Sequence, residues 1–165
     1  MLQIFNKTAP RVGLMNRQSS DESLNGSPRV NRNRKLVSRY LRKIGRDADL
    51  DLSLDSYGYC YIPFKKFLII IRVPDDETGL VHFQTMVFDL DSSKGITKTH
   101  QKVAAANLVD VRLGQRGSLL RMEGDEISLS LSTPIRGLRY ADMLEHLEDF
   151  MQTAVDTNTN LASIR

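Results

Sequence analysis

The fold of this chain is decided by residues 98–131, which read KTHQKVAAANLVDVRLGQRGSLLRMEGDEISLSL. The first part of this stretch, 98–109, is rich in alanine and predicts a helix that packs closely on a neighbouring element. Two strand-like runs follow and are joined by Gly124 and Asp125, a spacing that predicts a hairpin. In the second run apolar residues alternate with serine, which gives that strand one apolar face, made by Ile127, Leu129 and Leu131.

Upstream of this stretch, residues 34–45 repeat apolar side chains at helical spacing, and basic side chains occupy the other side. The pattern predicts an amphipathic helix that ends at Gly45. Alternating aspartate and leucine over 49–55 then predict a strand with one solvent-exposed face. This strand leads through a turn into the strand 59–64.

Three further segments complete the pattern. Residues 66–73 are apolar on both faces, as expected for a strand that is covered on two sides or lies centrally in a sheet. Residues 80–90 predict a longer strand, and residues 138–155 predict the last helix, with one narrow apolar seam. The fold class is therefore α+β: a twisted, mainly antiparallel five-stranded sheet with three helices, in the order α-β-β-β-α-β-β-α.

The two signs of charge are segregated along the chain. Of the 165 residues, 41% are hydrophobic and 26% are charged, which is typical of a globular domain. Residues 1–46 carry a net charge of +9, and because the whole chain carries +3, the remainder carries −6. We expect a basic tail over 1–33, either disordered or a transit peptide, an α+β domain over 34–156, and a frayed C-terminus over 157–165.

The basic N-terminal part suggests an anion-binding surface. Clustered lysine and arginine neutralise phosphates, so the candidate partners are nucleic acid and an anionic membrane. A solvated tail or helix face explains the same charges without a partner, because only Tyr40 offers a ring on which a base could stack. The candidate anion-binding residues are Arg32, Arg34, Lys35 and Arg39.

No motif in the sequence indicates catalysis or a metal site. Cys60 is the only cysteine, and no basic or histidine neighbour in its strand would activate it. The aspartates around residue 50 resemble a calcium loop, but Leu52 stands where the sharp turn needs glycine. The histidines lack metal-binding spacing. We therefore expect no enzyme, no cofactor, no metal and, since no run of about 20 apolar residues occurs, no transmembrane segment.

From about residue 34 to residue 154 the chain resembles the type III secretion chaperones of the Tir chaperone (CesT-like) family. The resemblance is carried by KLVSRYLRKIG, DLDLSLDSYGYCYI, LIIIRV, the helix ending AAANL, the hairpin GSLLRMEGDEISLSL and the helix after STPI. The order of helices and strands agrees with that family as well. The family is usually acidic, whereas this chain carries an additional basic stretch ahead of its first helix.

The resemblance implies a homodimer without ATPase activity that holds an extended segment of a client protein. The residues that it places near a dimer interface are Ala105, Leu108, Val111 and Leu119. The residues that it assigns to apolar client-binding surfaces are Leu36, Tyr40, Ile127, Leu129 and Leu131.

Two functions stay open at this point. The first is a chaperone-like binding module in the cytoplasm, whose partner is an apolar client segment that drops alternate side chains into pockets at a sheet edge. The second is an organelle assembly or scaffold subunit, in a mitochondrion or plastid if residues 1–33 are a transit peptide, whose basic tail binds anionic lipid or RNA. In the first case we expect Leu129→Asp to abolish client binding. In the second case we expect neutralisation of Arg32, Arg34, Lys35 and Arg39 to abolish the binding of anionic lipid or RNA.

Overall fold

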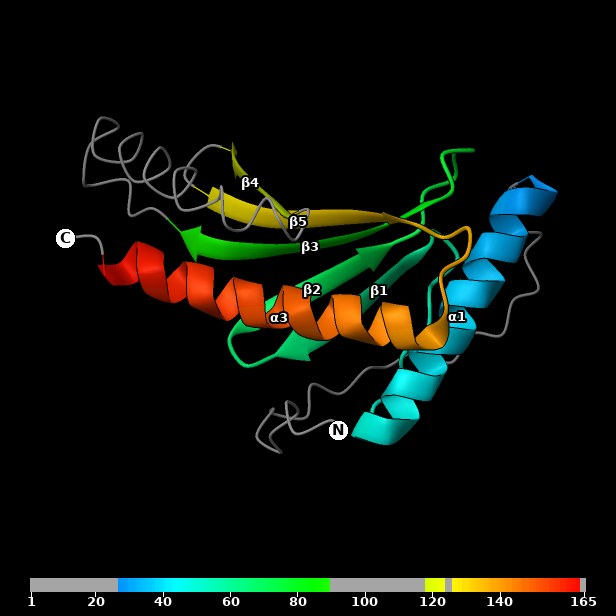
Figure 1. The fold of residues 1–165 in the computed structure, drawn as a ribbon, viewed down its shortest axis with the longest axis horizontal. Helices are drawn as coiled ribbons and strands as arrows, with labels where there is room; N and C mark the ends of the chain where they lie inside the picture. The colour runs from blue at the N-terminus through cyan, green and yellow to red at the C-terminus, as the bar shows by residue number, and fades with distance from the viewer. Residues whose placement is uncertain (1–26, 90–117, 124–125, 164–165) are drawn as a thin grey trace.

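The computed structural model describes residues 27–89, 118–123 and 126–163. Within these residues the chain forms two helices, α1 (Pro28–Ala48) and α3 (Tyr140–Ser163), and five strands. Helix α3 lies along one face of the sheet, and α1 crosses near the beginning of α3 (Figure 1). The helix expected over 98–109 lies outside the described residues.

The sheet has the strand order β1-β2-β3-β5-β4, and every neighbouring pair is antiparallel, which confirms the predicted five-stranded antiparallel sheet. Strands β1 and β4 lie at its two edges, and a register shift interrupts β3 between Met86 and Phe88. The strands are β1 (Tyr59–Phe64), β2 (Phe67–Arg72), β3 (Leu80–Asp89), β4 (Ser118–Glu123) and β5 (Glu126–Pro134).

Helix α1 begins at Pro28, ahead of the residue 34 at which the sequence analysis placed it. Ser27 caps the helix because its side chain accepts a hydrogen bond of 3.4 Å from the Val30 amide. Pro28 fits the first turn, where its missing N–H would have had no partner within the helix. Because Val30 is buried, the folded domain includes residues that the analysis had assigned to the tail.

Gly45 does not end α1, contrary to the expectation. A Cβ atom at Gly45 would lie 2.4 Å from the carbonyl oxygen of Leu50, so the absence of a side chain lets the following segment pack against the helix. The helix ends at Asp49, whose left-handed backbone (φ 58°) reverses the chain. The expected strand over 49–55 is also wrong: its leucines pack toward the core beside α1, with Leu52 fully inside, and the segment pairs with no described strand.

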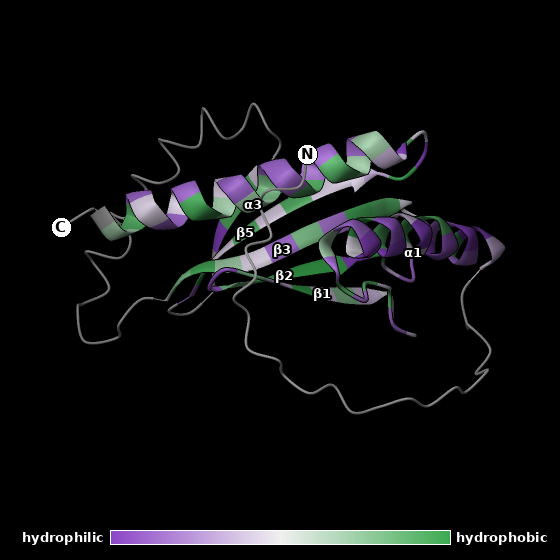
Figure 2. Cartoon of the chain, turned by 90° about the horizontal axis from the view of Figure 1, so that it is seen from below, coloured by the Kyte–Doolittle hydropathy of each residue, from purple (hydrophilic) through white to green (hydrophobic). Residues whose placement is uncertain are grey.

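The core lies between the two helices and one face of the sheet (Figure 2). Every second residue of each central strand points into it, and the rings of Phe83 and Phe150 meet there with centroids 5.8 Å apart. The expected fraying of residues 157–165 is wrong for most of that range, because α3 continues to Ser163. Thr157 and Leu161 are buried, and the Asn158 side chain donates a hydrogen bond to the carbonyl oxygen of Val87. No helix in the described ranges is long and apolar enough to cross a membrane.

Candidate functional site

The face of the sheet opposite the helices carries an unusual set of apolar side chains. In the described part of the chain five large hydrophobic residues are exposed, and four of them lie on this face, with exposed fractions between 48% and 57%. They come from four different strands, so no single loop or terminus explains their exposure. We call this surface the open face and define it by Tyr61, Leu68, Met86 and Leu119.

The strand register shows how the open face is organised. One row of cross-strand neighbours runs over all five strands: Tyr61, Ile70, Gln84, Ser130 and Leu119. The row is apolar over β1 and β2, becomes polar over β3 and β5, and ends on an apolar residue in β4. The open face therefore has a broad apolar end near β1 and a smaller one at β4, separated by the serines of β5.

Aromatic rings extend the apolar end toward the edge of the sheet. The rings of Tyr59 and Tyr61 stack with their centroids 6.2 Å apart and their planes inclined by 10°. The Arg72 guanidinium lies 5.4 Å from the Tyr59 ring, a distance at which a cation is attracted to the ring face. Tyr57, at 77% the most exposed large apolar residue among those described, lies just ahead of β1. Strand β1 thus offers a flat apolar surface next to its outer edge, which pairs with no described strand.

Polar groups border the open face where β3 and β5 meet. His82 Nδ1 and Ser132 Oγ are 2.7 Å apart and share a hydrogen bond. Burial, and after it the positive charge of Arg72, lower the pKa of His82, while Asp76 opposes them. This histidine therefore favours its neutral form near neutral pH and acts as a hydrogen-bonding group.

Ile127, Leu129 and Leu131, which the sequence analysis assigned to client binding, point the other way. All three are buried in the core on the face that α3 covers. The period-two pattern correctly separated an apolar from a polar face, but it did not show that the apolar face packs inside the same chain. A client groove on these side chains is therefore not available on the folded chain.

Two residues of α1, one aliphatic and one aromatic, were expected to bind a client, and both are only partly accessible to solvent. Leu36 and Tyr40 pack against the core, and the Tyr40 hydroxyl donates a hydrogen bond of 3.1 Å to the carbonyl oxygen of Leu138. The Tyr40 and Tyr140 rings meet edge to face at 6.0 Å. Both contacts join α1 to the beginning of α3, so these residues serve the fold first.

One of the four candidate anion-binding residues is buried, and the other three are exposed. Arg34 is only 7% exposed, and its guanidinium donates hydrogen bonds to the carbonyl oxygens of Val73, Ser56 and Tyr57 at 3.3, 3.4 and 3.2 Å. The assignment of Arg34 to anion binding is therefore wrong, because its donors are already used by the backbone. Arg32, Lys35 and Arg39 are exposed on α1.

Of the four residues predicted at the dimer interface, the structure describes only one. Ala105, Leu108 and Val111 lie outside the described residues, so their role stays a prediction. Leu119 lies on the outer side of β4 and is 57% exposed, which leaves it accessible to a second chain.

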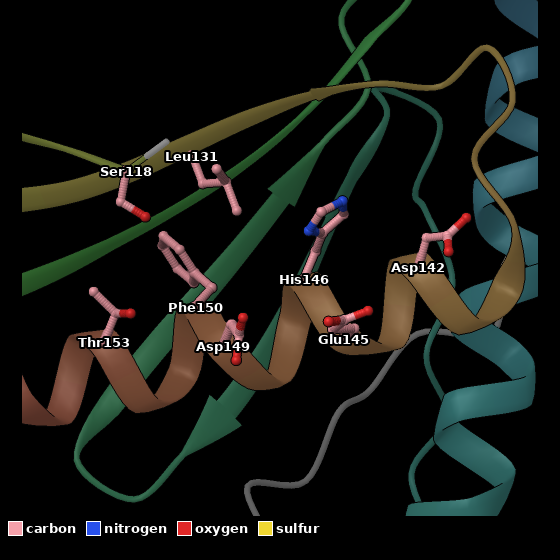
Figure 3. A pocket seen from close by; sticks show the side chains of 8 residues that line it. All are labelled: Ser118, Leu131, Asp142, Glu145, His146, Asp149, Phe150 and Thr153. Atoms are coloured by element: carbon pink, nitrogen blue, oxygen red, sulfur yellow. The ribbon is translucent and has the colours of Figure 1, made fainter. Parts of the chain in front are cut away.

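A groove of about 370 Å³ separates α3 from the β4–β5 hairpin (Figure 3). The Asp142 carboxylate accepts two hydrogen bonds from the Arg139 guanidinium and one from the Arg139 backbone N–H, and these lower the pKa of Asp142 to about 2. The described residues contain no cluster that could hold a metal ion. Three carboxylates give the groove an acidic lining, which consists of Ser118, Leu131, Asp142, Glu145, His146, Asp149, Phe150 and Thr153.

The thiol of Cys60 is not a nucleophile. It is buried in β1, and burial, against a backbone hydrogen bond from Ser53, raises its pKa to about 11. A thiol with that pKa is almost fully protonated at neutral pH, so it reacts slowly.

Solved structures share this fold. A chain of the ExsC–ExsE complex matches with a TM-score of 0.63 at 16% sequence identity, over 80% of this chain and 98% of that chain. A chain of the HopA1–SchA chaperone–effector complex gives a TM-score of 0.59 at 13% identity, over 78% of this chain and 97% of that chain. No protein-family model and no curated protein matches the sequence. These likenesses confirm the α+β fold with a five-stranded sheet that the resemblance predicted, and the third helix stays a prediction.

Of the four residues that define the open face, only Leu119 was among the predicted site residues, and it was assigned to the dimer interface. One signal for them was present in the sequence, because residues 66–73 are apolar on both faces. That pattern predicts a strand that is covered on two sides or lies centrally in a sheet, and β2 does lie between β1 and β3. Among the described residues only one side of β2 is covered, and Leu68 stands half exposed on the other.

Proposed function

We propose that this chain is a non-enzymatic, chaperone-like module that holds an extended apolar segment of a client protein on its open face. The observation that carries the proposal is the concentration of exposed large apolar side chains there, four of the five in the described residues. Large exposed apolar patches on otherwise polar proteins commonly mark interaction surfaces. The fold likeness to a chain of a chaperone–effector complex supports the same function.

The apolar end of the open face suits an extended client. Neighbouring strands lie about 4.8 Å apart, so Tyr61, Ile70 and Leu68 form a surface on which alternate side chains of a passing strand can rest. The outer side of β1 pairs with no described strand, and an added strand there would gain backbone hydrogen bonds. Side-chain contacts on the face and hydrogen bonds at the edge would then act together.

The proposal includes a homodimer formed at the opposite end. Leu119 is separated from the apolar end by Gln84 and Ser130, so a second chain at β4 would leave the client surface free. We propose Ala105, Leu108 and Val111 as further contacts of that interface, as the resemblance implies. The two roles then occupy different ends of the same face and can be tested separately.

Client binding is tested with an array of extended peptides and three forms of the full chain. We expect wild type to retain peptides with alternating apolar residues, and Leu68→Asp to weaken this binding by at least about tenfold because it places a charge at the centre of the apolar end. Gln84→Asp adds the same charge to the polar part of the face and should bind like wild type. If Leu68→Asp retains the same peptides as strongly as wild type, the open face is not the client surface.

The dimer is tested by light scattering behind a sizing column. A chain beginning at Ser27, rather than further along, keeps the whole of α1 and its cap. We expect twice the chain mass for wild type, the single mass for Leu119→Asp, and an unchanged dimer for Ser130→Asp on the neighbouring strand. A wild-type monomer at all concentrations would refute the dimer while leaving the client proposal standing.

A further inference from the structure

Helix α1 carries an uninterrupted row of positive charges on its exposed side. Five basic residues follow one another at alternating intervals of three and four, which places them along one side of an α-helix. All five are exposed. We call them the basic row, and they are Arg32, Lys35, Arg39, Arg42 and Arg46.

The only carboxylate within α1 is that of Asp47, at the end of the helix, and it accepts a hydrogen bond from the Tyr140 hydroxyl. No acidic residue occurs between Pro28 and Arg46, and no ion pair joins any member of the row to another residue in the described ranges. Other cations of the helix are engaged: Arg34 is buried, and the Lys43 ammonium lies 3.8 Å from the centre of the Tyr140 ring. Solvated helix faces usually mix both signs, because like charges three or four residues apart repel each other. The row is therefore a surface that a bound anion would stabilise.

The row also borders a cavity. Arg39, Arg42 and Arg46 line a groove of about 380 Å³ whose other side is the turn that follows α1. This side contributes the partly exposed Leu50, the exposed Asp51 and the buried Leu52. The groove thus offers guanidinium donors, one acceptor and an apolar wall within a few residues of each other.

We propose that the basic row and its groove bind an extended acidic peptide segment of a partner protein, with one apolar side chain of that segment seated against Leu50. Carboxylates of the segment pair with the arginines, and a backbone amide of the segment donates to Asp51. The row runs over fifteen residues of helix, from Arg32 to Arg46, and its two ends lie about 21 Å apart, so about six or seven residues of extended peptide span it.

The chemistry of the groove selects a peptide over the other polyanions. A bilayer surface presents phosphates in a plane, which leaves the hollow and Leu50 without a contact. Single-stranded nucleic acid binds through stacked aromatic rings as well as charge, and none lines the groove. An acidic peptide supplies carboxylates, amide donors and an apolar side chain together. The site lies on α1 and not on the open face, so it can fail without affecting the proposed function.

The test uses the full chain and a fluorescent peptide of about ten residues, slightly longer than the row, made of glutamate and glycine with one central leucine. Its controls are the same peptide with glutamine for glutamate and the same peptide with glycine for leucine. Two protein variants lose two positive charges each: Arg39→Gln/Arg42→Gln in the row, and Lys65→Gln/Arg136→Gln at exposed positions elsewhere. Glutamine keeps the helix propensity of arginine, so α1 should stay folded, as circular dichroism can confirm.

We expect saturable binding of the glutamate peptide, measured by fluorescence anisotropy, and a loss of at least about tenfold in the row variant, since charge-assisted pairs are the strong ones. The variant with equal charge loss elsewhere should bind like wild type. Leu50→Asn should weaken the peptide with leucine and leave the peptide with glycine unchanged.

Three outcomes would overturn the proposal. Equal weakening in both double variants would mean that net charge alone attracts the peptide. Tighter binding of a single-stranded RNA, or of phosphatidylcholine vesicles containing phosphatidylserine, at the same salt concentration would assign the row to nucleic acid or to a membrane. Failure of the glutamate peptide to bind, or binding equal to that of its glutamine analogue, would remove the site.

Discussion

Replacing Arg34 by methionine tests the central structural role that the fold gives to this residue. The guanidinium joins α1 to the turn before β1 and to the end of β2, through hydrogen bonds to Ser56, Tyr57 and Val73. Methionine keeps most of the apolar stem but removes every donor. The substitution therefore separates the hydrogen bonds of Arg34 from its packing.

The three acceptors contribute unequally to the expected loss. The carbonyl oxygen of Val73 belongs to a buried residue, and leaving it without its donor costs about 1–3 kcal/mol. Ser56 and Tyr57 are exposed, so water replaces the guanidinium and the loss there is about 1 kcal/mol in total. The ion pair with Asp75 is 3.7 Å long and half exposed, and it adds at most about 1 kcal/mol. We expect Arg34→Met to lower the free energy of unfolding by about 2–4 kcal/mol.

Urea denaturation followed by circular dichroism measures this loss. With a slope of about 2 kcal/mol per molar urea, the midpoint should fall by about 1–2 M. Arg39→Met makes the same chemical change on the exposed side of the same helix and should alter stability by less than about 0.5 kcal/mol. Equal losses in the two variants would refute the reasoning, because helix propensity or charge would then account for both.

Three further predictions concern stability and reactivity. Leu129→Asp should prevent folding, seen as lost ellipticity, because a charge replaces a fully buried side chain; a folded variant would contradict the core assignment. Asp142 has a folded pKa of about 2, below its unfolded value near 3.9, so its contribution to stability is present above the unfolded value and is lost as the pH falls toward 2. Asp142→Asn should therefore be less stable than wild type at pH 6 but not at pH 2, by thermal denaturation; a constant difference would argue against the pair with Arg139. Cys60 should react with a chromogenic disulfide reagent only on unfolding, and rapid reaction of the native chain would show that β1 opens.

The five strands of the sheet could be predicted from the sequence because their signals are local, but the same kind of alternation wrongly predicted a further strand over 49–55. Alternation in β5 and the glycine-aspartate turn before it depend on neighbouring residues only, and the hairpin pairs as expected, with Leu120 opposite Leu129. The ends of the helices could not be predicted in the same way. Gly45 has the identity of a helix terminator, but its role depends on the close approach of Leu50, which is a contact made by the folded chain.

The candidate anion-binding residues, too, could be predicted from the sequence only in part. Arg32, Lys35 and Arg39 were identified from the sequence, and Arg34 was grouped with them because it has the same charge. Its position in the helix turns it inward, where backbone carbonyls of two other segments accept its hydrogen bonds. Residues distant in the sequence decide that environment, so charge alone could not separate Arg34 from its neighbours.

The sequence by itself determined the alternation of polar and apolar faces, the order of the strands along the chain and the excess of positive charge in α1, because each is a property of residues close together in the chain. Only the tertiary structure decided which apolar face is covered. Helices α1 and α3 pack on the face that contains Leu129, and Leu68 and Met86 remain exposed on the other. The residues of a strand do not by themselves show which of its two faces is buried. The packing of distant helices decides which face joins the core and which stays free to bind.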